Sequence, residues 1–200
     1  MITLFYDFET SGLNIFHEDV IEIGCKCLED GEVFTCLVKP LSDKQLSDKI
    51  ISLTGISDGD LLKDGLPCKE AFTQFFDFIK GYYDNDKEVL LIAHNGRSFD
   101  DMFLKRMHRY LQGEELTTYD EMMDNLYFID SLLVTKCIFP TIYSHSMYNL
   151  CKYFNIKNEQ AHRAMGDVNA LELIWVEVNK MLKYNKTEVS GDQLRYITYA

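Results

Sequence analysis

The chain has 200 residues, of which 46% are hydrophobic, and a formal net charge of −12 at pH 7. This length fits one domain with a core of useful size, and the negative charge argues against unspecific binding of nucleic acid, which depends on clustered Lys and Arg. It does not exclude an enzyme that holds a few nucleotides through metal ions.

No apolar segment has the length needed to cross a membrane, and the N-terminus lacks the features of a secretory leader. We therefore expect an intracellular protein, cytoplasmic or nuclear, that is neither secreted nor bound to a membrane. The cysteines contain no Cys-x-x-Cys pair, so a zinc site of that kind is not supported, and reduced structural thiols are expected. They are Cys25, Cys27, Cys36, Cys68, Cys137 and Cys151.

The N-terminal half of the sequence predicts three consecutive antiparallel strands and then a helix. A tight-turn signal at 29–31 joins the second and third strands. Residues 41–65 are polar and irregular and are expected to contain short helical turns. Pro67 can open a helix, whose apolar stripe predicts an end near Gly81. The three predicted strands are 2–8, 20–28 and 32–40.

The C-terminal half alternates strands and helices. The run VLLIAH is continuously apolar, which is typical of a strand buried on both faces. The segment 113–125 is interpreted as an insertion near the functional site. The other expected elements are strands at 89–94 and 127–130, a loop at 95–98, and helices at 99–111, 131–137, 146–154 and 163–183.

This order of elements predicts an α/β fold. Its mixed five-stranded sheet, with three antiparallel strands followed by parallel ones, is flanked by helices. The first and fourth strands are expected to lie side by side. The chain is divided into one domain, 1–183, and a C-terminal extension, 184–200, which can pack on the same domain.

Two acids lie at the end of the first predicted strand. Side chains alternate along a strand, so Asp7 and Glu9 share one face with Thr3 and Phe5. Burying two like charges is costly, so this pair requires a cation, a shared proton or water.

Two further acids lie where helices begin. Asp100 follows the fourth predicted strand, and Asp167 lies beside the apolar stripe of the last helix. Each alone has a structural interpretation, as an acid that complements a helix dipole or pairs with a neighbour. Together the four acids predict a site for divalent cations such as Mg²⁺ or Mn²⁺, which prefer oxygen ligands. His162 is the nearby group that can take a proton from water around neutral pH.

Three segments of the sequence resemble, in order and spacing, the motifs of the DEDDh exonucleases. They are DFETSG (7–12), AHNGRSFDDMFL (93–104) and HRAMGD (162–167). These DnaQ-like 3′→5′ exonucleases, which include proofreading subunits, belong to the ribonuclease H-like superfamily. The middle motif is most similar to that of the three-prime repair exonucleases. The resemblance covers about residues 2–175 and implies a ribonuclease H-like fold, with an exonuclease domain at 1–183.

The resemblance also implies a chemistry. Two Mg²⁺ ions, for which Mn²⁺ can substitute, are expected about 3.5–4 Å apart between the acids. His162 matches the family's general base, and hydrolysis is expected to release nucleoside 5′-monophosphates. The catalytic and metal-binding acids implied are Asp7, Glu9, Asp100 and Asp167.

Residues around the motifs are interpreted as substrate contacts. The resemblance implies that the loop after the first strand seats the 3′-terminal nucleotide, with Leu13 wedged against the last base step, although a plain turn could have the same composition. Arg97 and Arg163 flank the motifs and are candidates for phosphate contact. His94 is expected to support its loop, and the basic residues within 105–109 to form a solvated surface. The predicted substrate-binding residues are Thr10, Ser11, Gly12, Leu13, Asn95, Phe99, Arg97 and Arg163.

Several functional alternatives stay open. Single-stranded or frayed 3′ ends of DNA are the favoured substrate because of the middle motif, but RNA-directed exoribonucleases share these residues. A non-catalytic binding module on the same fold is disfavoured because all four acids and the histidine are present. The chain could serve a polymerase as a proofreader or act in repair or turnover, so a polymerase or repair partner is also considered.

Overall fold

The computed structural model describes residues 1–42, 44–86, 88–112, 119–185 and 198–199. Its strands are β1 (Ile2–Thr10), β2 (Val20–Cys27), β3 (Val33–Leu37), β4 (Val89–Ala93), β5 (Tyr127–Asp130) and β6 (Thr198–Tyr199). Its helices are α1 (Asp48–Thr54), α2 (Asp58–Asp64), α3 (Cys68–Asp86), α4 (Asp100–Gln112), α5 (Asp120–Asn125), α6 (Ser131–Ile138), α7 (Met147–Tyr153) and α8 (Ala164–Asn185), with a 3₁₀ turn, η1 (Gly96–Ser98).

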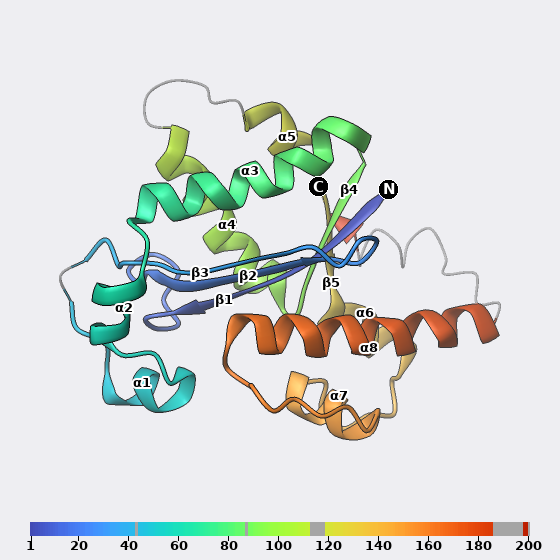
Figure 1. Ribbon diagram of the computed structural model, residues 1–200. Helices are drawn as coiled ribbons and strands as arrows, with labels where there is room; N and C mark the ends of the chain where they lie inside the picture. The colour runs from blue at the N-terminus through green and yellow to red at the C-terminus, as the bar shows by residue number, and fades with distance from the viewer. Residues whose placement is uncertain (43, 87, 113–118, 186–197, 200) are drawn as a thin grey trace.

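The strands form one mixed sheet in the order β3-β2-β1-β4-β5-β6. The first three strands pair antiparallel, whereas β1, β4 and β5 pair parallel. Helices cover both faces, with α3, α4 and α5 on one side and α6, α7 and α8 on the other (Figure 1). The five predicted strands and the pairing of the first with the fourth are confirmed.

The two-residue β6 adds an antiparallel edge beside β5. Of the predicted extension 184–200, the structure describes 184–185 and 198–199. The division of the chain into a domain and an extension stays a prediction.

Alternation along β1 separates two halves of the core. Leu4, Tyr6 and Phe8 pack with side chains of α3 and α4, whereas Phe5 packs with side chains of α8. The predicted alternation is confirmed. The two acids of β1 are in step with Phe5, so they lie on the face that α8 covers.

The helix α3 extends beyond its predicted end. It continues past Gly81 to Asp86, and Tyr83 within this last part is buried. A glycine inside a helix costs about 0.5–1 kcal/mol relative to alanine, which is less than the roughly 1.5–3 kcal/mol gained by burying a large apolar side chain. The predicted end at Gly81 is therefore wrong.

The helix α5 forms where no helix was predicted. Tyr119, just before it, packs on the ring of Phe76 and donates a 2.7 Å hydrogen bond to Asp77. This packing attaches α5 to α3, on the side of the sheet opposite to α8 (Figure 1). The expectation that the insertion lies near the functional site stays a prediction for residues 119–125, and 113–118 lie outside the described residues.

The described residues contain neither a disulfide nor a helix with the length and apolar character needed to cross a bilayer. All six cysteines are free thiols, and four of them are buried. Burial raises the pKa of the Cys25 thiol, so this side chain acts as a small apolar group in the core.

A glycine on β2 sets how closely α8 approaches the sheet. Gly24 pairs with Asp7, and a Cβ atom at Gly24 would lie 2.7 Å from the carbonyl carbon of Ala164 and 2.9 Å from the backbone nitrogen of Met165. Glycine leaves that space to the first turn of α8. Since Asp167 lies in the same turn, the close packing carries its carboxylate toward β1.

We expect Gly24→Ala to destabilise the protein by about 1–3 kcal/mol, because the new methyl group meets backbone atoms that can move only with α8. The matched control is Gly81→Ala in α3, where a Cβ atom meets nothing within 4 Å. This control should gain about 0.5–1 kcal/mol. Urea unfolding measures both changes, and a Gly24→Ala protein as stable as the wild type would contradict the close packing.

Candidate active site

Three carboxylates converge where β1 ends and α8 begins. Oxygen atoms of Asp7, Glu9 and Asp167 lie within 4.8 Å of one another. The first two share one face of β1, and the third comes from the first turn of α8. Residues that are far apart in the sequence therefore form one acidic cluster.

Asp100, the first residue of α4, reaches the same place. It is buried, and its Oδ1 accepts a 3.1 Å hydrogen bond from the N–H of Phe8, beyond the part of β1 that pairs with β4. The charge of Asp100 contributes to the raised pKa of Asp7. The structure thus brings together all four acids that the sequence singled out.

Burial and crowding of like charges raise the pKa of the acids in this cluster. Burial, followed by the charges of Asp100 and Asp167, holds the pKa of Asp7 well above its usual range. Burial, followed by the charge of Asp167, raises the pKa of Glu9 to about 8. Burial also raises the pKa of Asp100 and of Asp167, although N–H donors oppose the shift. Without a cation, the cluster retains protons at neutral pH.

The chemistry of these donors fits a hard divalent cation. All four groups are carboxylates, the ligand type that Mg²⁺ and Mn²⁺ prefer. Within the described part of the chain, no Lys or Arg forms an ion pair with Asp7, Glu9 or Asp167. A bound cation would offset both the burial of these charges and their mutual repulsion, which together raise the pKa values.

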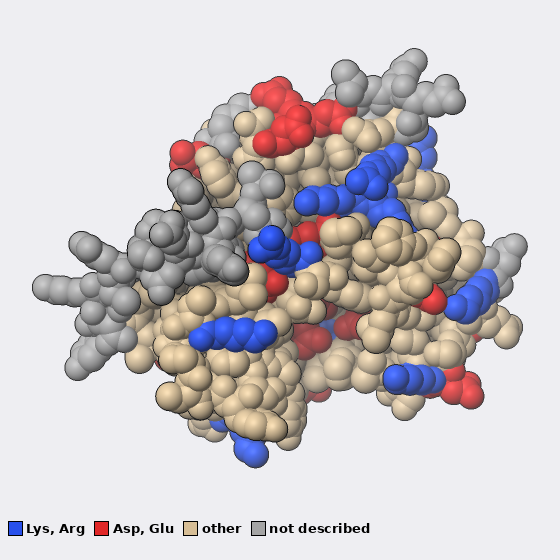
Figure 2. All heavy atoms as spheres, turned by 180° about the vertical axis from the view of Figure 1, so that it is seen from behind, with Lys and Arg blue, Asp and Glu red and all other residues tan. Residues whose placement is uncertain are grey.

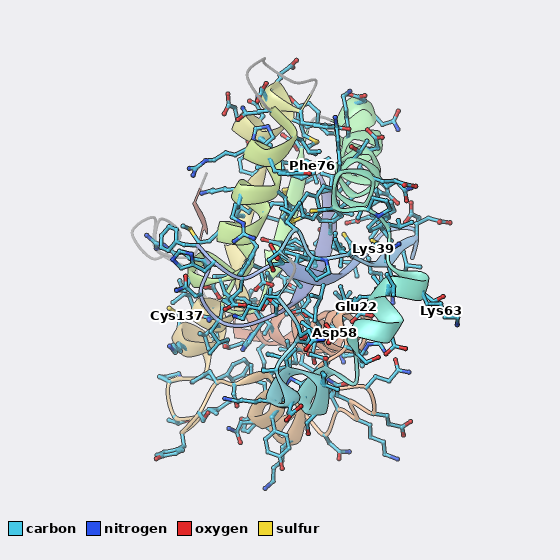
Figure 3. The ribbon with its side chains drawn as sticks, turned by 90° about the vertical axis from the view of Figure 1, so that its left-hand side faces the viewer. Glu22, Lys39, Asp58, Lys63, Phe76 and Cys137 are labelled. Atoms are coloured by element: carbon cyan, nitrogen blue, oxygen red, sulfur yellow. The ribbon has the colours of Figure 1, made fainter. Side chains whose placement is uncertain are left out.

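A fifth acid, which the sequence analysis missed, lies next to this cluster. Glu22 pairs with Glu9 in the β1–β2 ladder, is buried, and lies between the sheet and the start of α8 (Figure 3). Its carboxylate accepts hydrogen bonds from the guanidinium of Arg163, 2.6 Å from Nη2, and from the N–H of Ala164 at 2.9 Å. These contacts fasten α8 to β2. The sequence signal that could have identified Glu22 is a charged residue within the apolar run VIEIG.

The same contacts bear on the predicted role of Arg163. Its guanidinium forms an ion pair with Glu22, while 45% of its side chain is exposed. Its contact with a substrate phosphate stays a prediction.

Two donors hold the carboxylate of Asp167. Asn158 donates from Nδ2 to Oδ1 at 2.7 Å, and the backbone N–H of His162 donates to Oδ2 at 3.1 Å. His162 has a φ of 63°, a left-handed conformation that is uncommon outside glycine and often found at functional sites. No sequence signal pointed to Asn158.

The side chain of His162 is exposed at the edge of a pocket. This pocket of about 470 Å³ lies between α7 and the start of α8 and is also lined by Asp167, Tyr148 and Lys152. The predicted general base and one predicted metal ligand therefore face the same space.

The loop predicted to bind substrate follows β1 directly. The hydroxyl of Thr10 donates a 2.7 Å hydrogen bond to the carbonyl of Gly12, and the hydroxyl of Ser11 donates one of 2.7 Å to Glu18. Leu13 is 82% exposed. The loop is thus ordered by its own polar contacts while its apolar residue stays accessible to a ligand.

Asp130 organises the loop between β4 and α4. Its carboxylate accepts hydrogen bonds from the N–H groups of Asn95 at 3.0 Å and Arg97 at 3.3 Å. It also caps α6 through the N–H of Leu132 at 3.0 Å. One buried carboxylate therefore fixes two predicted substrate-binding residues relative to β5.

The remaining predicted residues of this region have structural contacts. The ring nitrogens of His94 lie 2.8 Å from the hydroxyl of Ser131 and 2.9 Å from the carbonyl of His145, as expected for a residue that supports its loop. Phe99 is partly buried and packs edge-on against Phe103.

The basic segment 105–109 is not uniformly solvated. Arg106 donates a 2.7 Å hydrogen bond to the carbonyl of Ile15, in the loop after β1. The expectation of a solvated surface is wrong for this residue. Its donor groups fit a pair of backbone carbonyls, which a sequence pattern does not reveal.

Comparison with known proteins identifies the family. The family model described as "Exonuclease" matches residues 4–174, a range that contains the four clustered acids and His162. The chain belongs to this exonuclease family. The predicted membership in the DEDDh, DnaQ-like 3′→5′ exonucleases is confirmed.

Relatives of this exonuclease include far longer proteins. The DNA polymerase III PolC-type of Bacillus subtilis is 31% identical over 181 residues, and that of Bacillus cereus is 33% identical over 181 residues. Each match covers 89% of this chain and 11% of the relative. The chain thus spans about a tenth of the length of these relatives.

Solved structures share the fold of this exonuclease. E. coli Exonuclease I in complex with a dT13 oligonucleotide has a TM-score of 0.73 at 18% identity, covering 98% of this chain and 45% of that one. A product-bound structure of exonuclease I also has a TM-score of 0.73, at 16% identity, covering 98% of this chain and 48% of that one. The predicted ribonuclease H-like fold is therefore confirmed.

We expect the metal-free exonuclease to lose stability as the pH rises from about 5 to about 8. The folded protein keeps protons on the acids, whereas the unfolded chain releases them above the ordinary Glu pKa of 4.5, so the contribution of Glu9 is present below that value and is lost by about 8. Each proton that the folded protein retains and the unfolded chain has released lowers the free energy of unfolding by about 1.4 kcal/mol per pH unit. Urea midpoints measured in EDTA across this range provide the measurement.

Two controls accompany this experiment. Excess Mg²⁺ should flatten the dependence, and Asp7→Asn should weaken it because one of the acids that retain a proton is gone. Stability that rises with pH in EDTA would contradict the crowded arrangement of the acids.

Proposed function

We propose that this exonuclease is a divalent-metal enzyme that hydrolyses single-stranded or frayed 3′ ends of DNA and releases nucleoside 5′-monophosphates. The observation that carries the proposal is the convergence of Asp7, Glu9 and Asp167 within 4.8 Å, with Asp100 beside them. Carboxylates so close repel one another, and cations that remove this repulsion also attract the oxygens of a phosphodiester.

These four acids would hold two ions, Mg²⁺ or Mn²⁺, which when bound stabilise negative charge on the attacking and leaving oxygens. Asp167 is prepared for this task because Asn158 and the backbone of His162 fix its orientation. Glu22 is not available as a further ligand, since Arg163 and the N–H of Ala164 already engage its carboxylate.

We assign the role of general base to His162. Its imidazole is exposed on the pocket that Asp167 also lines, so it can take a proton from a water molecule that attacks the terminal phosphodiester. The hydrogen bond from its backbone to Asp167 keeps the residue at the edge of the acidic cluster.

The loops on either side of the acids would bind the last nucleotides. Residues 10–13 would seat the terminal sugar and base, and Asn95 and Phe99 would border the same space. Arg97 and Arg163 would contact phosphates. The net charge of −12 does not oppose this, because Lys and Arg side chains lie on the face where acidic side chains line a hollow (Figure 2).

DNA is the favoured substrate for two reasons. The relatives are named DNA polymerase III PolC-type, and the structural neighbour Exonuclease I was solved with dT13. The first reason also supports a polymerase partner, whereas a free-standing role in repair or turnover and an RNA substrate are the alternatives. A non-catalytic binding module is the alternative of a different class.

We expect wild-type protein with Mg²⁺ to shorten a single-stranded DNA oligonucleotide from its 3′ end, faster than the matched RNA. Asp167→Asn should lower the rate by roughly 10³–10⁵-fold, because the four acids are proposed to bind the metal ions together and the loss of one would disable the site. The matched control is Glu177→Gln, an acid on the same helix that pairs with Lys180 instead. Gel analysis of radiolabelled oligonucleotides provides the rates.

The same assay decides among the alternatives. Faster loss of the RNA would assign the protein to RNA turnover. Resistance of both oligonucleotides with Mg²⁺ and with Mn²⁺ would remove the enzymatic proposal and leave the binding module.

We expect His162→Gln to lower kcat by about 10²–10⁴-fold near neutral pH, because the attacking water loses its proton acceptor. Affinity for Mg²⁺, measured by calorimetry, should change little, since the contact with Asp167 uses the backbone N–H. Unchanged turnover of this variant would rule out the assignment of the base.

A further inference from the structure

The loop between β1 and β2, which follows the strand that carries Asp7 and Glu9, exposes two large apolar side chains. Leu13 is 82% exposed and Phe16 is 77% exposed, whereas Ile15 between them packs against the core. Single exposed apolar residues are ordinary, but two within four residues of one loop call for a ligand that would cover them. Phe16 belongs to none of the sequence motifs.

The loop is closed by contacts among its own residues. Ser11 donates a 2.7 Å hydrogen bond to Glu18 and accepts one of 2.9 Å from the N–H of Asp19. The side chain of Asn14 accepts a 3.0 Å hydrogen bond from the N–H of Phe16. These contacts fix the backbone on both sides of the exposed phenyl ring.

Arg106 fastens this closed loop to α4. Its guanidinium donates to the carbonyls of Ile15 and Glu18 and lies 3.4 Å from the carboxylate of Asp19. The guanidinium also stacks on the ring of Phe103, 5.2 Å from its centroid, which restricts its own freedom. The loop is therefore held by the helix that begins at Asp100.

We propose that Phe16, in the loop that Arg106 holds, is a second apolar contact, in addition to Leu13, for the bases at the 3′ end of the substrate. This inference rests on the proposed function. It adds a specificity-determining residue, Phe16, and a positioning residue, Arg106, to that function.

Nucleic-acid bases are the ligand that fits these two exposed side chains. Bases offer flat apolar faces, and aromatic side chains stack on them with little regard to sequence. The loop continues directly from the strand that carries Asp7 and Glu9, so a chain end held at those acids lies next to it. A loop fixed before binding loses little conformational entropy when a ligand arrives.

The test uses two single-stranded DNA oligonucleotides that differ only at the 3′ end. One is complete, and the other lacks the bases of its last two nucleotides. For the complete oligonucleotide, Phe16→Ala should raise KM about 5- to 100-fold with kcat nearly unchanged. For the oligonucleotide without these bases, the same variant should behave like the wild type. The matched control is Leu173→Ala, an exposed apolar residue on α8, which should change neither value.

The outcomes separate this inference from the proposed function. An equal effect of Phe16→Ala on both oligonucleotides, or no effect on either, overturns the inference. If the wild type cleaves neither oligonucleotide, fluorescence anisotropy with Ca²⁺ in place of Mg²⁺ compares their affinities. A loss of affinity confined to the complete oligonucleotide then supports the contact, and no loss rejects it.

Arg106 is tested by a graded pair of variants. Arg106→Met keeps the stem over Phe103 but removes the donors, so it should raise KM for the complete oligonucleotide as Phe16→Ala does. Arg106→Lys should recover part of the effect because it restores one donor. Circular dichroism checks that Arg106→Met is folded. If the folded variant has an unchanged KM, substrate binding does not depend on the contacts between the loop and α4.

Discussion

The approach of the first turn of α8 to β2 is the contact on which the site depends. Gly24 provides the space, and Glu22 fastens the turn by binding both Arg163 and the N–H of Ala164. Asp167 is carried into place by this packing. If the helix lay farther from the sheet, Asp7 and Glu9 would face water and no cluster of three carboxylates would form.

The acidic cluster destabilises the folded protein, and hydrogen bonds from the surrounding fold only partly offset this effect. Burial and like charges raise the pKa of Asp7 and Glu9, while donors from Phe8, Asn158 and His162 relieve the two acids on the helices. No comparable donor is recorded for the two acids of β1 among the described contacts. The acids without such donors therefore lie on one strand, β1, where the first two predicted metal ligands lie.

Rigid supports surround the site on three sides. Asp130 fixes the loop that precedes α4, Arg106 fixes the loop that follows β1, and Glu22 fixes α8. Each support is a charged side chain bound to backbone groups of another element. Such contacts fix the position of each loop or helix through its backbone.

The sequence alone determined the face on which Asp7 and Glu9 lie, the order of the main elements and the four acids that meet. These features follow from alternation, helical periodicity and motif spacing, which are local properties of the chain. Only the tertiary structure decided that Glu22 caps α8, that Arg106 binds Ile15, that α3 runs past Gly81, and that α5 packs on α3. Partners such as Glu22 and Ala164, 142 residues apart, are chosen by packing, and no local pattern records which distant backbone group a buried charge will meet.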